Sequence, residues 1–256
     1  MKLKGKTALV TGGAQRVGRA IALRLAQEGL NVAFSFHSSA GDAARTSTEI
    51  AASGVRAVAI SADLTRLDHC EFLVKAAESH FPTVDVFVHN ASQFPRTPLA
   101  ELAADPDEFA RVFDAQSRLH MQAALWLGAR IGLAMKRRGW GRIVHVCDQI
   151  VHRTQAYPNY SVYLATKYGL LGASQALAAE LAPEVQVNTV APGLVIPPEG
   201  TDEKTAEILK SRNLLLSQAG PQEIAEDVVF LVKSNFKTGS ILVSDGGASL
   251  KGFSSG

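Results

Sequence analysis

The stretch "TALVTGGAQRVGRAIALRLAQEG" at residues 7–29 decides the fold, because it joins three signals in one order. An apolar, β-branched run at 7–12 is typical of a buried strand, and apolar residues at helical spacing follow from 17 to 28. Between them, glycines allow a tight turn and a close approach of the backbone to a ligand. A strand, a glycine turn and a helix are typical of the first unit of a dinucleotide-binding domain, in which the helix N-terminus binds a pyrophosphate.

The rest of the chain repeats this alternation of short apolar runs with longer helical patterns. Strands are predicted at 7–12, 31–36, 56–61, 84–89, 142–147, 185–190 and 240–245, and helices at 17–28, 41–53, 67–80, 106–137, 160–182 and 221–234. Strands that are apolar on both faces and separated by helices indicate a parallel sheet covered on both sides. We therefore predict a single doubly wound (Rossmann) α/β domain over residues 1–256, with a seven-stranded parallel sheet.

Composition narrows the class of protein further. The 256 residues are 46% hydrophobic and 20% charged with a net charge of +2, which suits one large core and argues against a nucleic-acid partner. No apolar run approaches the roughly 20 residues that span a bilayer, and the first residues lack the features of a signal peptide. We expect a cytoplasmic protein with no membrane partner. Cys70 and Cys147 have no metal-ligand spacing, so we expect reduced thiols and no metal.

In such a sheet, ligands bind beyond the carboxyl ends of the strands, so the residues after each strand are candidates for cofactor contacts. His37, Ser38 and Ser39 follow the second strand, where a carboxylate would bind the 2′-OH of NAD, and Asp42 comes only later. Arg16 lies inside the glycine turn, where a guanidinium can reach a phosphate. The sequence therefore predicts NADP(H) rather than NAD.

The third, fourth and sixth strands supply further candidates. Asp63 is predicted to accept a hydrogen bond at the adenine edge, with the N-cap of the following helix as the alternative. The complete predicted cofactor set is Gly12, Arg16, Val17, Gly18, His37, Ser38, Ser39, Asp63, Leu64, Asn90, Ala91, Ser92, Tyr163, Lys167, Pro192 and Gly193.

A candidate catalytic pair lies in "YLATK" at 163–167. Tyr163 and Lys167 are four residues apart and share a face of the predicted helix. A phenol has a pKa near 10, and a neighbouring ammonium favours the phenolate. Tyr157 and Tyr160 lack such a lysine, so we interpret them as lining or packing residues, whereas Asp148 ends the fifth strand and brings a carboxylate to the same edge.

Together, "TGGAQRVG", "HNAS" and "YLATK" resemble the short-chain dehydrogenase/reductase family over nearly the whole chain. The resemblance implies that Tyr163 is the general acid, and that Lys167 lowers its pKa and hydrogen-bonds the nicotinamide ribose. It implies a turn at Pro192–Gly193 near the nicotinamide, and a homotetramer assembled through the helix at 221–234 and the last strand.

Three departures from the common family pattern are similar to the pteridine reductases and dihydromonapterin reductases. Arg16 and Ser92 stand for glycines, Asp148 stands for the catalytic serine, and Phe94 follows "HNAS". This resemblance implies that Phe94 stacks on a pterin ring, that Arg16 and Ser92 line the same slot, and that Asp148 and Tyr163 pass protons to the pterin. The chemistry agrees, because a carboxylate accepts ring N–H groups but repels the developing alkoxide of a ketone.

Some positions do not match this subgroup. The segment between Asp148 and Tyr163 is about two residues longer than the resemblance leads us to expect, which could displace Asp148. Gln116 replaces an asparagine that kinks a helix and anchors a water in the family. Ser38 stands where many pteridine reductases have a second basic residue.

The leading hypothesis is an NADPH-dependent reductase of a C=N bond in a pterin, dihydropterin or dihydrofolate, with residues 194–216 as a substrate lid. One alternative is a carbonyl (ketone or 3-oxoacyl) reductase of the same family. The other is a catalytically silent NADP-binding sensor or partner protein, which Gln116 and the longer segment motivate.

Overall fold

The computed structural model describes residues 3–152, 158–196 and 202–253. Seven parallel strands form one sheet in the order β3-β2-β1-β4-β5-β6-β7, which confirms the predicted doubly wound α/β fold. The order reverses direction between β1 and β4, where such sheets open a crevice for ligands. The strands are β1 (Thr7–Val10), β2 (Asn31–Phe36), β3 (Ala57–Ser61), β4 (Val86–His89), β5 (Gly141–Val146), β6 (Val185–Pro192) and β7 (Ile241–Ser244).

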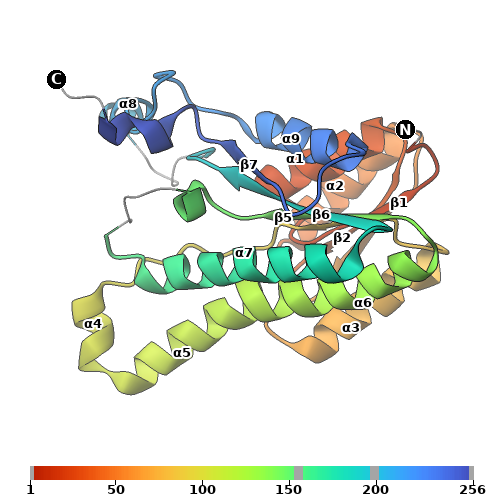
Figure 1. Cartoon of the computed structure of the whole chain (residues 1–256), viewed down its shortest axis with the longest axis horizontal. Coiled ribbons are helices and arrows are strands. Elements are labelled where there is room, and N and C mark those ends of the chain that lie inside the picture. Colours follow the sequence, from red (N-terminus) through yellow and green to blue (C-terminus); the bar gives the residue numbers. More distant parts are fainter. Residues whose placement is uncertain (1–2, 153–157, 197–201, 254–256) are drawn as a thin grey trace.

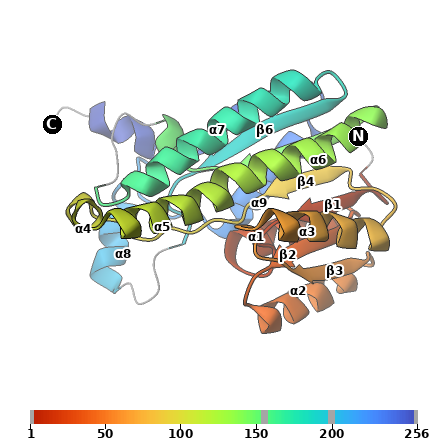
Figure 2. The ribbon, with the colours of Figure 1, turned by 90° about the horizontal axis from the view of Figure 1, so that it is seen from below.

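Helices cover both faces of the sheet (Figures 1 and 2). One layer consists of α1 (Arg16–Gln27), α2 (Ala40–Ala52) and α9 (Pro221–Lys233), and the other of α3 (Leu67–His80), α6 (Ala123–Arg137) and α7 (Ser161–Leu181).

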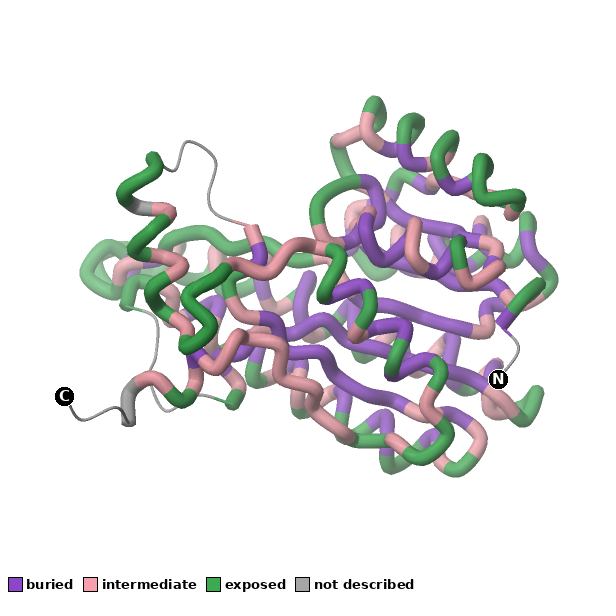
Figure 3. Tube along the Cα trace, turned by 90° about the horizontal axis from the view of Figure 1, so that it is seen from above, coloured by how far each residue is buried: buried purple, intermediate pink, exposed green. Residues whose placement is uncertain are grey.

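The sheet therefore has an apolar core on each face. The adjacent residues Leu9 and Val10 of β1 belong to the two different cores, because successive side chains of a strand point to opposite faces. This double burial explains why the strand sequences are apolar without interruption, and Figure 3 shows long buried segments in the centre of the molecule with exposed segments around them.

The predicted helix at 106–137 is divided in the structure. It consists of α5 (Pro106–Ser117), a π-helical turn η1 (Arg118–Gln122) and α6. α5 begins where the Asp105 carboxylate accepts hydrogen bonds from two backbone N–H groups of the first turn. A π turn contains one extra residue within otherwise helical spacing, so the apolar pattern of the sequence does not reveal it.

Other elements were not predicted because they are short. They are α4 (Leu99–Ala104), α8 (Glu203–Lys210), and the 3-10 turns η2 (Gln149–His152) and η3 (Ala248–Phe253). α8 lies within the proposed lid at 194–216, of which residues 197–201 lie outside the described residues, as does Tyr157. The lid stays a prediction.

Candidate active site

A pocket of about 420 Å³ opens at the carboxyl ends of β1 to β4. The loops after these four strands line it, which is the position that a doubly wound sheet offers to a dinucleotide. Its lining residues include Gly12, Arg16, Val17, Gly18, His37, Ser38, Ser39, Asp63, Leu64, Asn90, Ala91 and Ser92, all from the predicted cofactor set. Of that set, Tyr163, Lys167, Pro192 and Gly193 are not among the lining residues of this pocket.

Hydrogen bonds between side chains and backbone groups hold the glycine turn against the loop after β4. The Asn90 amide donates to the carbonyl oxygens of Thr11 and Gly12 at 3.1 and 3.2 Å, and Thr11 Oγ1 accepts the backbone N–H of Asn90 at 2.9 Å. A Cβ atom on Gly18 would lie 2.0 Å from Gly12 O and 2.5 Å from Asn90 Nδ2. Only glycine fits at position 18, because the two atoms that a side chain would strike, Gly12 O and Asn90 Nδ2, are hydrogen-bonded to each other.

Arg16 has a backbone φ of +54°, in the left-handed region that favours glycine. This conformation explains why glycine is common there in the resembling family. An arginine in this conformation lowers the stability of the folded protein by roughly 1 kcal/mol. The side chain is exposed and lines the pocket, where it can meet an anionic group.

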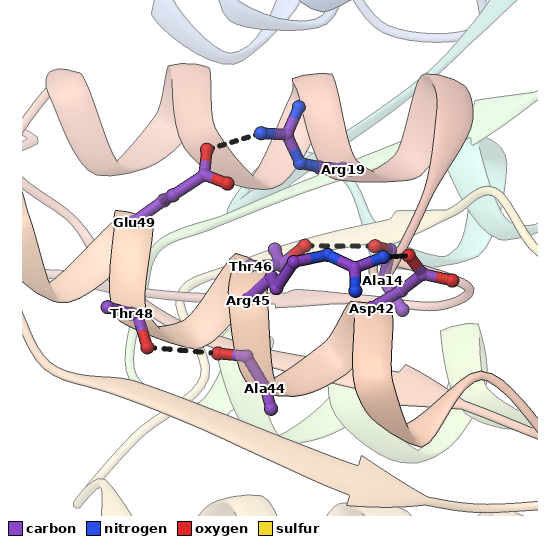
Figure 4. Close-up of polar contacts among 8 residues, drawn as sticks. All are labelled: Ala14, Arg19, Asp42, Ala44, Arg45, Thr46, Thr48 and Glu49. Atoms are coloured by element: carbon purple, nitrogen blue, oxygen red, sulfur yellow. Dashed lines mark hydrogen bonds and ion pairs between the residues drawn. The ribbon is translucent and has the colours of Figure 1, made fainter.

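No carboxylate follows β2 directly. The first one along the chain, Asp42, lies in the first turn of α2 and pairs with Arg45 (Figure 4). The same helix supports the glycine turn, since Thr46 Oγ1 donates to Ala14 O at 2.9 Å. Asp42 is not among the lining residues of the pocket.

Asp63 shapes the wall of the pocket after β3. Its Oδ1 accepts the backbone N–H and the hydroxyl of Thr65 at 3.0 and 2.8 Å. The helix-cap alternative is wrong, because α3 begins after Arg66 and not after Asp63.

Tyr163 and Lys167 are both buried on α7, with 5% and 2% of their surfaces exposed. The Lys167 ammonium lies 5.5 Å from the centroid of the Tyr163 ring and donates to Val146 O at 3.3 Å. Burial lowers the pKa of Lys167, and the neighbouring Asp148 carboxylate partly offsets this effect.

Asp148 follows β5 and contacts Tyr163 directly. Its Oδ2 accepts the Tyr163 hydroxyl at 2.8 Å, and its Oδ1 accepts the backbone N–H of Ile150 at 2.9 Å in the turn that leads into η2. The longer segment between the two residues therefore leaves Asp148 in contact with Tyr163. Because each oxygen has its own donor, the carboxylate is held in one orientation.

Phe94 lies in the loop after β4 and stacks on Tyr160, with ring centroids 4.1 Å apart and planes within 5°. The Tyr163 ring meets it edge-on at 4.6 Å. Tyr160, interpreted from the sequence as a lining or packing residue, is thus the stacking partner of Phe94. The aromatic group lies directly beside the candidate general acid.

His120 is a site residue that the sequence reasoning missed. It lies in the π turn, fully buried, with Nδ1 2.8 Å from Thr166 Oγ1 and Nε2 3.0 Å from Ser92 Oγ. The feature of the sequence that could have identified it is a single histidine inside the apolar stretch "LHM". Gln116, which replaces the family's water-anchoring asparagine, is also buried, and its amide has no hydrogen-bond partner among the described residues.

Two more histidines, His89 and His145, lie fully buried at the ends of β4 and β5, with ring centroids 6.2 Å apart. Burial and the nearby Lys167 charge lower the pKa of His145 to about 4, and burial lowers that of His89 well below its ordinary value. Both rings are therefore neutral near pH 7.

The two cysteines are buried and unpaired. Burial raises the pKa of Cys70 to about 12 and that of Cys147 to about 11, so both remain protonated thiols. Within the described ranges there is no group of three or more His, Cys, Asp or Glu residues that could hold a metal ion. None of the helices described is both long enough and apolar enough to cross a membrane.

Comparison with known proteins places this site in context. Residues 12–249 match the family model described as enoyl-(acyl carrier protein) reductase. The chain is 30% identical to glucose 1-dehydrogenase 2 of Bacillus subtilis over 97% of its length and 96% of that protein. It is 31% identical to a 3-oxoacyl-(acyl-carrier-protein) reductase of Staphylococcus epidermidis over 94% of its length and 98% of that protein.

Among solved structures, a blue fluorescent protein from a metagenomic library, in complex with NADPH, superposes with a TM-score of 0.87. That chain is 29% identical, and the match covers 97% of this chain and 100% of the other. None of these three relatives is named for a pterin.

Proposed function

Because the chain belongs to the short-chain dehydrogenase/reductase family and is an oxidoreductase, we propose that it reduces a C=N bond of a pterin or dihydropterin with NADPH. The observation that carries this proposal is the hydrogen bond from Tyr163 to Asp148. A carboxylate in contact with the general acid suits a substrate that presents N–H groups.

The residues at the carboxyl ends of β1 to β4 fit a dinucleotide phosphate. Gly18 packs directly against Gly12 O and so holds the start of α1 close to the glycine turn, and no side chain caps the N-terminal N–H groups of α1, which suit a pyrophosphate. Ser38, Ser39 and Arg16 line the pocket near β2, and none of them would repel a 2′-phosphate. When bound, NADPH supplies the hydride.

The chain's own groups then handle the proton. The Tyr163 hydroxyl points at Asp148 Oδ2, and the buried Lys167 ammonium nearby stabilises negative charge on the phenol oxygen. Asp148 accepts a ring N–H or exocyclic amine of the substrate, and Tyr163 with Asp148 delivers a proton to the nitrogen beside the reduced carbon. Phe94 and Tyr160 offer aromatic surface to a flat heterocycle.

Reduction of a ketone or a 3-oxoacyl thioester is the second candidate. The relative from S. epidermidis is named for the latter chemistry, so the relatives support this candidate better than the first. Asp148 stands against it, because a carboxylate facing the developing alkoxide is unfavourable.

The third candidate is an NADP-binding sensor or partner protein without turnover. It draws on Gln116, whose buried amide lacks a partner within the described part of the chain. NADPH binding without oxidation by any substrate of the panel below would support it.

The proposal includes a cytoplasmic homotetramer. Exposed apolar side chains on α6, α7 and α9, namely Leu125, Leu133, Tyr168 and Phe230, are the sort that a subunit contact covers. Sedimentation velocity at micromolar concentration tests this part, and a monomer would contradict it.

The deciding experiment follows NADPH oxidation with dihydrobiopterin, dihydromonapterin and dihydrofolate beside ketones and a 3-oxoacyl thioester. Wild type, Phe94→Ala and Asp148→Ser are compared, with Phe72→Ala as a matched control, because Phe72 and Phe94 are similarly exposed at 56% and 52%. We expect turnover of a pterin that falls about tenfold or more in Phe94→Ala and remains unchanged in Phe72→Ala. Turnover of ketones alone, increased in Asp148→Ser, would replace the first candidate by the second.

A further inference from the structure

His120 connects two separate parts of the active site. On one side, its Nε2 accepts the backbone N–H of Gln93 at 3.2 Å and lies 3.0 Å from Ser92 Oγ, in the loop between β4 and α4. On the other side, its Nδ1 lies 2.8 Å from Thr166 Oγ1 on α7, and its ring meets the Tyr163 ring edge-on at 5.7 Å. A single buried side chain therefore joins the loop to the helix of the candidate general acid.

The hydrogen bonds fix which nitrogen carries the proton. A backbone N–H can only donate, so Nε2 of His120 must accept from Gln93. The Thr166 hydroxyl donates to Tyr163 O at 3.0 Å, so its oxygen is left to accept from Nδ1. The ring is therefore neutral with the proton on Nδ1. Burial, together with the Lys167 charge, lowers the pKa of His120 to about 2, which agrees with this assignment.

The loop is also held at its far end. The Thr97 N–H donates to Asn159 O at 2.7 Å, next to Tyr160. Phe94 lies between this contact and the contact at Gln93, with its ring against Tyr160 and Tyr163. The position of Phe94 over the reacting centre thus depends on two anchors, of which His120 provides the one nearer to the cofactor pocket.

We propose that His120 is a positioning residue, which places the loop of Phe94 against Tyr163 and so sets the width of the substrate slot. The inference rests on the proposed function, because it takes Phe94 as a substrate contact. The proposal also assigns a role to the π turn, because His120 lies in this turn and contacts the loop from it.

Two conservative variants test separately the contact of His120 with the Gln93 N–H and its contact with Thr166. In His120→Gln the amide reaches the place of Nε2 and can accept from Gln93, whereas in His120→Asn it reaches only the place of Nδ1 and can bond Thr166. His80→Gln is the control, since that side chain is exposed at the end of α3.

We expect KM for the reducible substrate to rise about tenfold in His120→Asn and to stay within about twofold in His120→Gln, with the Kd for NADPH unchanged in both. The Gln93 amide should exchange with solvent about tenfold faster in His120→Asn only. A Gln variant as impaired as the Asn variant, or a wild-type KM in His120→Asn, would overturn the proposal.

Amide exchange separates this inference from the proposed function. If the wild type reduces nothing, the proposed function fails, and protection of the Gln93 amide then decides the role of His120 alone. Protection that is lost in His120→Asn and kept in His120→Gln supports the anchor, and equal protection in all variants overturns it.

Discussion

The two halves of the active site are built from different kinds of group. Around the glycine turn, each hydrogen bond with Asn90 has a backbone carbonyl or N–H group as one partner, and Gly18 has no space for a side chain. Around Tyr163, side chains hold one another through Asp148 and His120. We call the glycine turn and the loops around it the cradle. Because its contacts involve backbone groups, the cradle suits one constant cofactor, whereas the side chains around Tyr163 can change with the substrate while the fold remains.

The largest effect expected from this comparison is on the side-chain half. Tyr163→Phe removes the hydroxyl that donates to Asp148, so kcat should fall by about 10²–10⁴-fold while the Kd for NADPH stays unchanged. Steady-state kinetics and fluorescence titration of NADPH measure the two quantities. Tyr168→Phe also removes a hydroxyl from α7, one that donates to Ile150 O, and should cost at most a few-fold. Equal losses in the two variants would contradict the assignment of Tyr163.

The backbone half should respond in the opposite manner, through binding and stability. In Gly18→Ala the new Cβ atom would collide with Gly12 O, so we expect about hundredfold weaker NADPH binding and about 3 kcal/mol less stability. Titration with NADPH and urea unfolding measure both. In Gly41→Ala the added carbon meets only Arg45 Nη1 at 3.9 Å, so NADPH binding should not change and stability should not fall. A folded Gly18→Ala protein with normal affinity would break the comparison.

The buried histidines predict that acid destabilises the folded protein. The folded pKa of His145 is about 4 and its ordinary value is 6.5, so the unfolded chain binds more protons between these values. Stability is therefore present above pH 6.5 and is lost as the pH falls towards 4, by up to about 1.4 kcal/mol per pH unit for this residue. Urea unfolding between pH 7 and 4.5 should show a shallower dependence in His145→Leu. An unchanged slope would show that His145 does not titrate on unfolding.

The smallest effect is expected from removing the positive charge of Arg16, which lines the cofactor pocket. Because Arg16 is exposed, its removal should reduce the preference for NADPH over NADH by about fivefold. Affinities for both cofactors are compared in Arg16→Ala and in Arg111→Ala, which removes another exposed arginine, from α5. An unchanged preference in Arg16→Ala would remove the basis for choosing NADP over NAD.

The same division explains how much of the molecule could be predicted from sequence. The sheet and the cradle follow from local patterns, because each strand and the loop after it are contiguous in the chain. The contacts of His120 join residues that are 28 and 46 positions apart, and they depend on a π turn that leaves no mark on the apolar spacing. Asp148 was recognised by resemblance, but its hydrogen bond to the backbone in η2 required the structure.

The π turn also sets the angular phase of the helices on either side of it. An α-helix advances about 100° per residue, so the extra residue of η1 rotates α5 by that angle relative to a continuous helix. α6 buries an apolar face against the sheet, whereas Gln116 is the one residue of α5 that is buried. Deleting a single residue from Arg118–Gln122 would therefore turn the whole of α5 about its axis and leave α6 in place. A change of one residue in this five-residue turn can thus reorient a neighbouring helix while α6 keeps its place on the sheet.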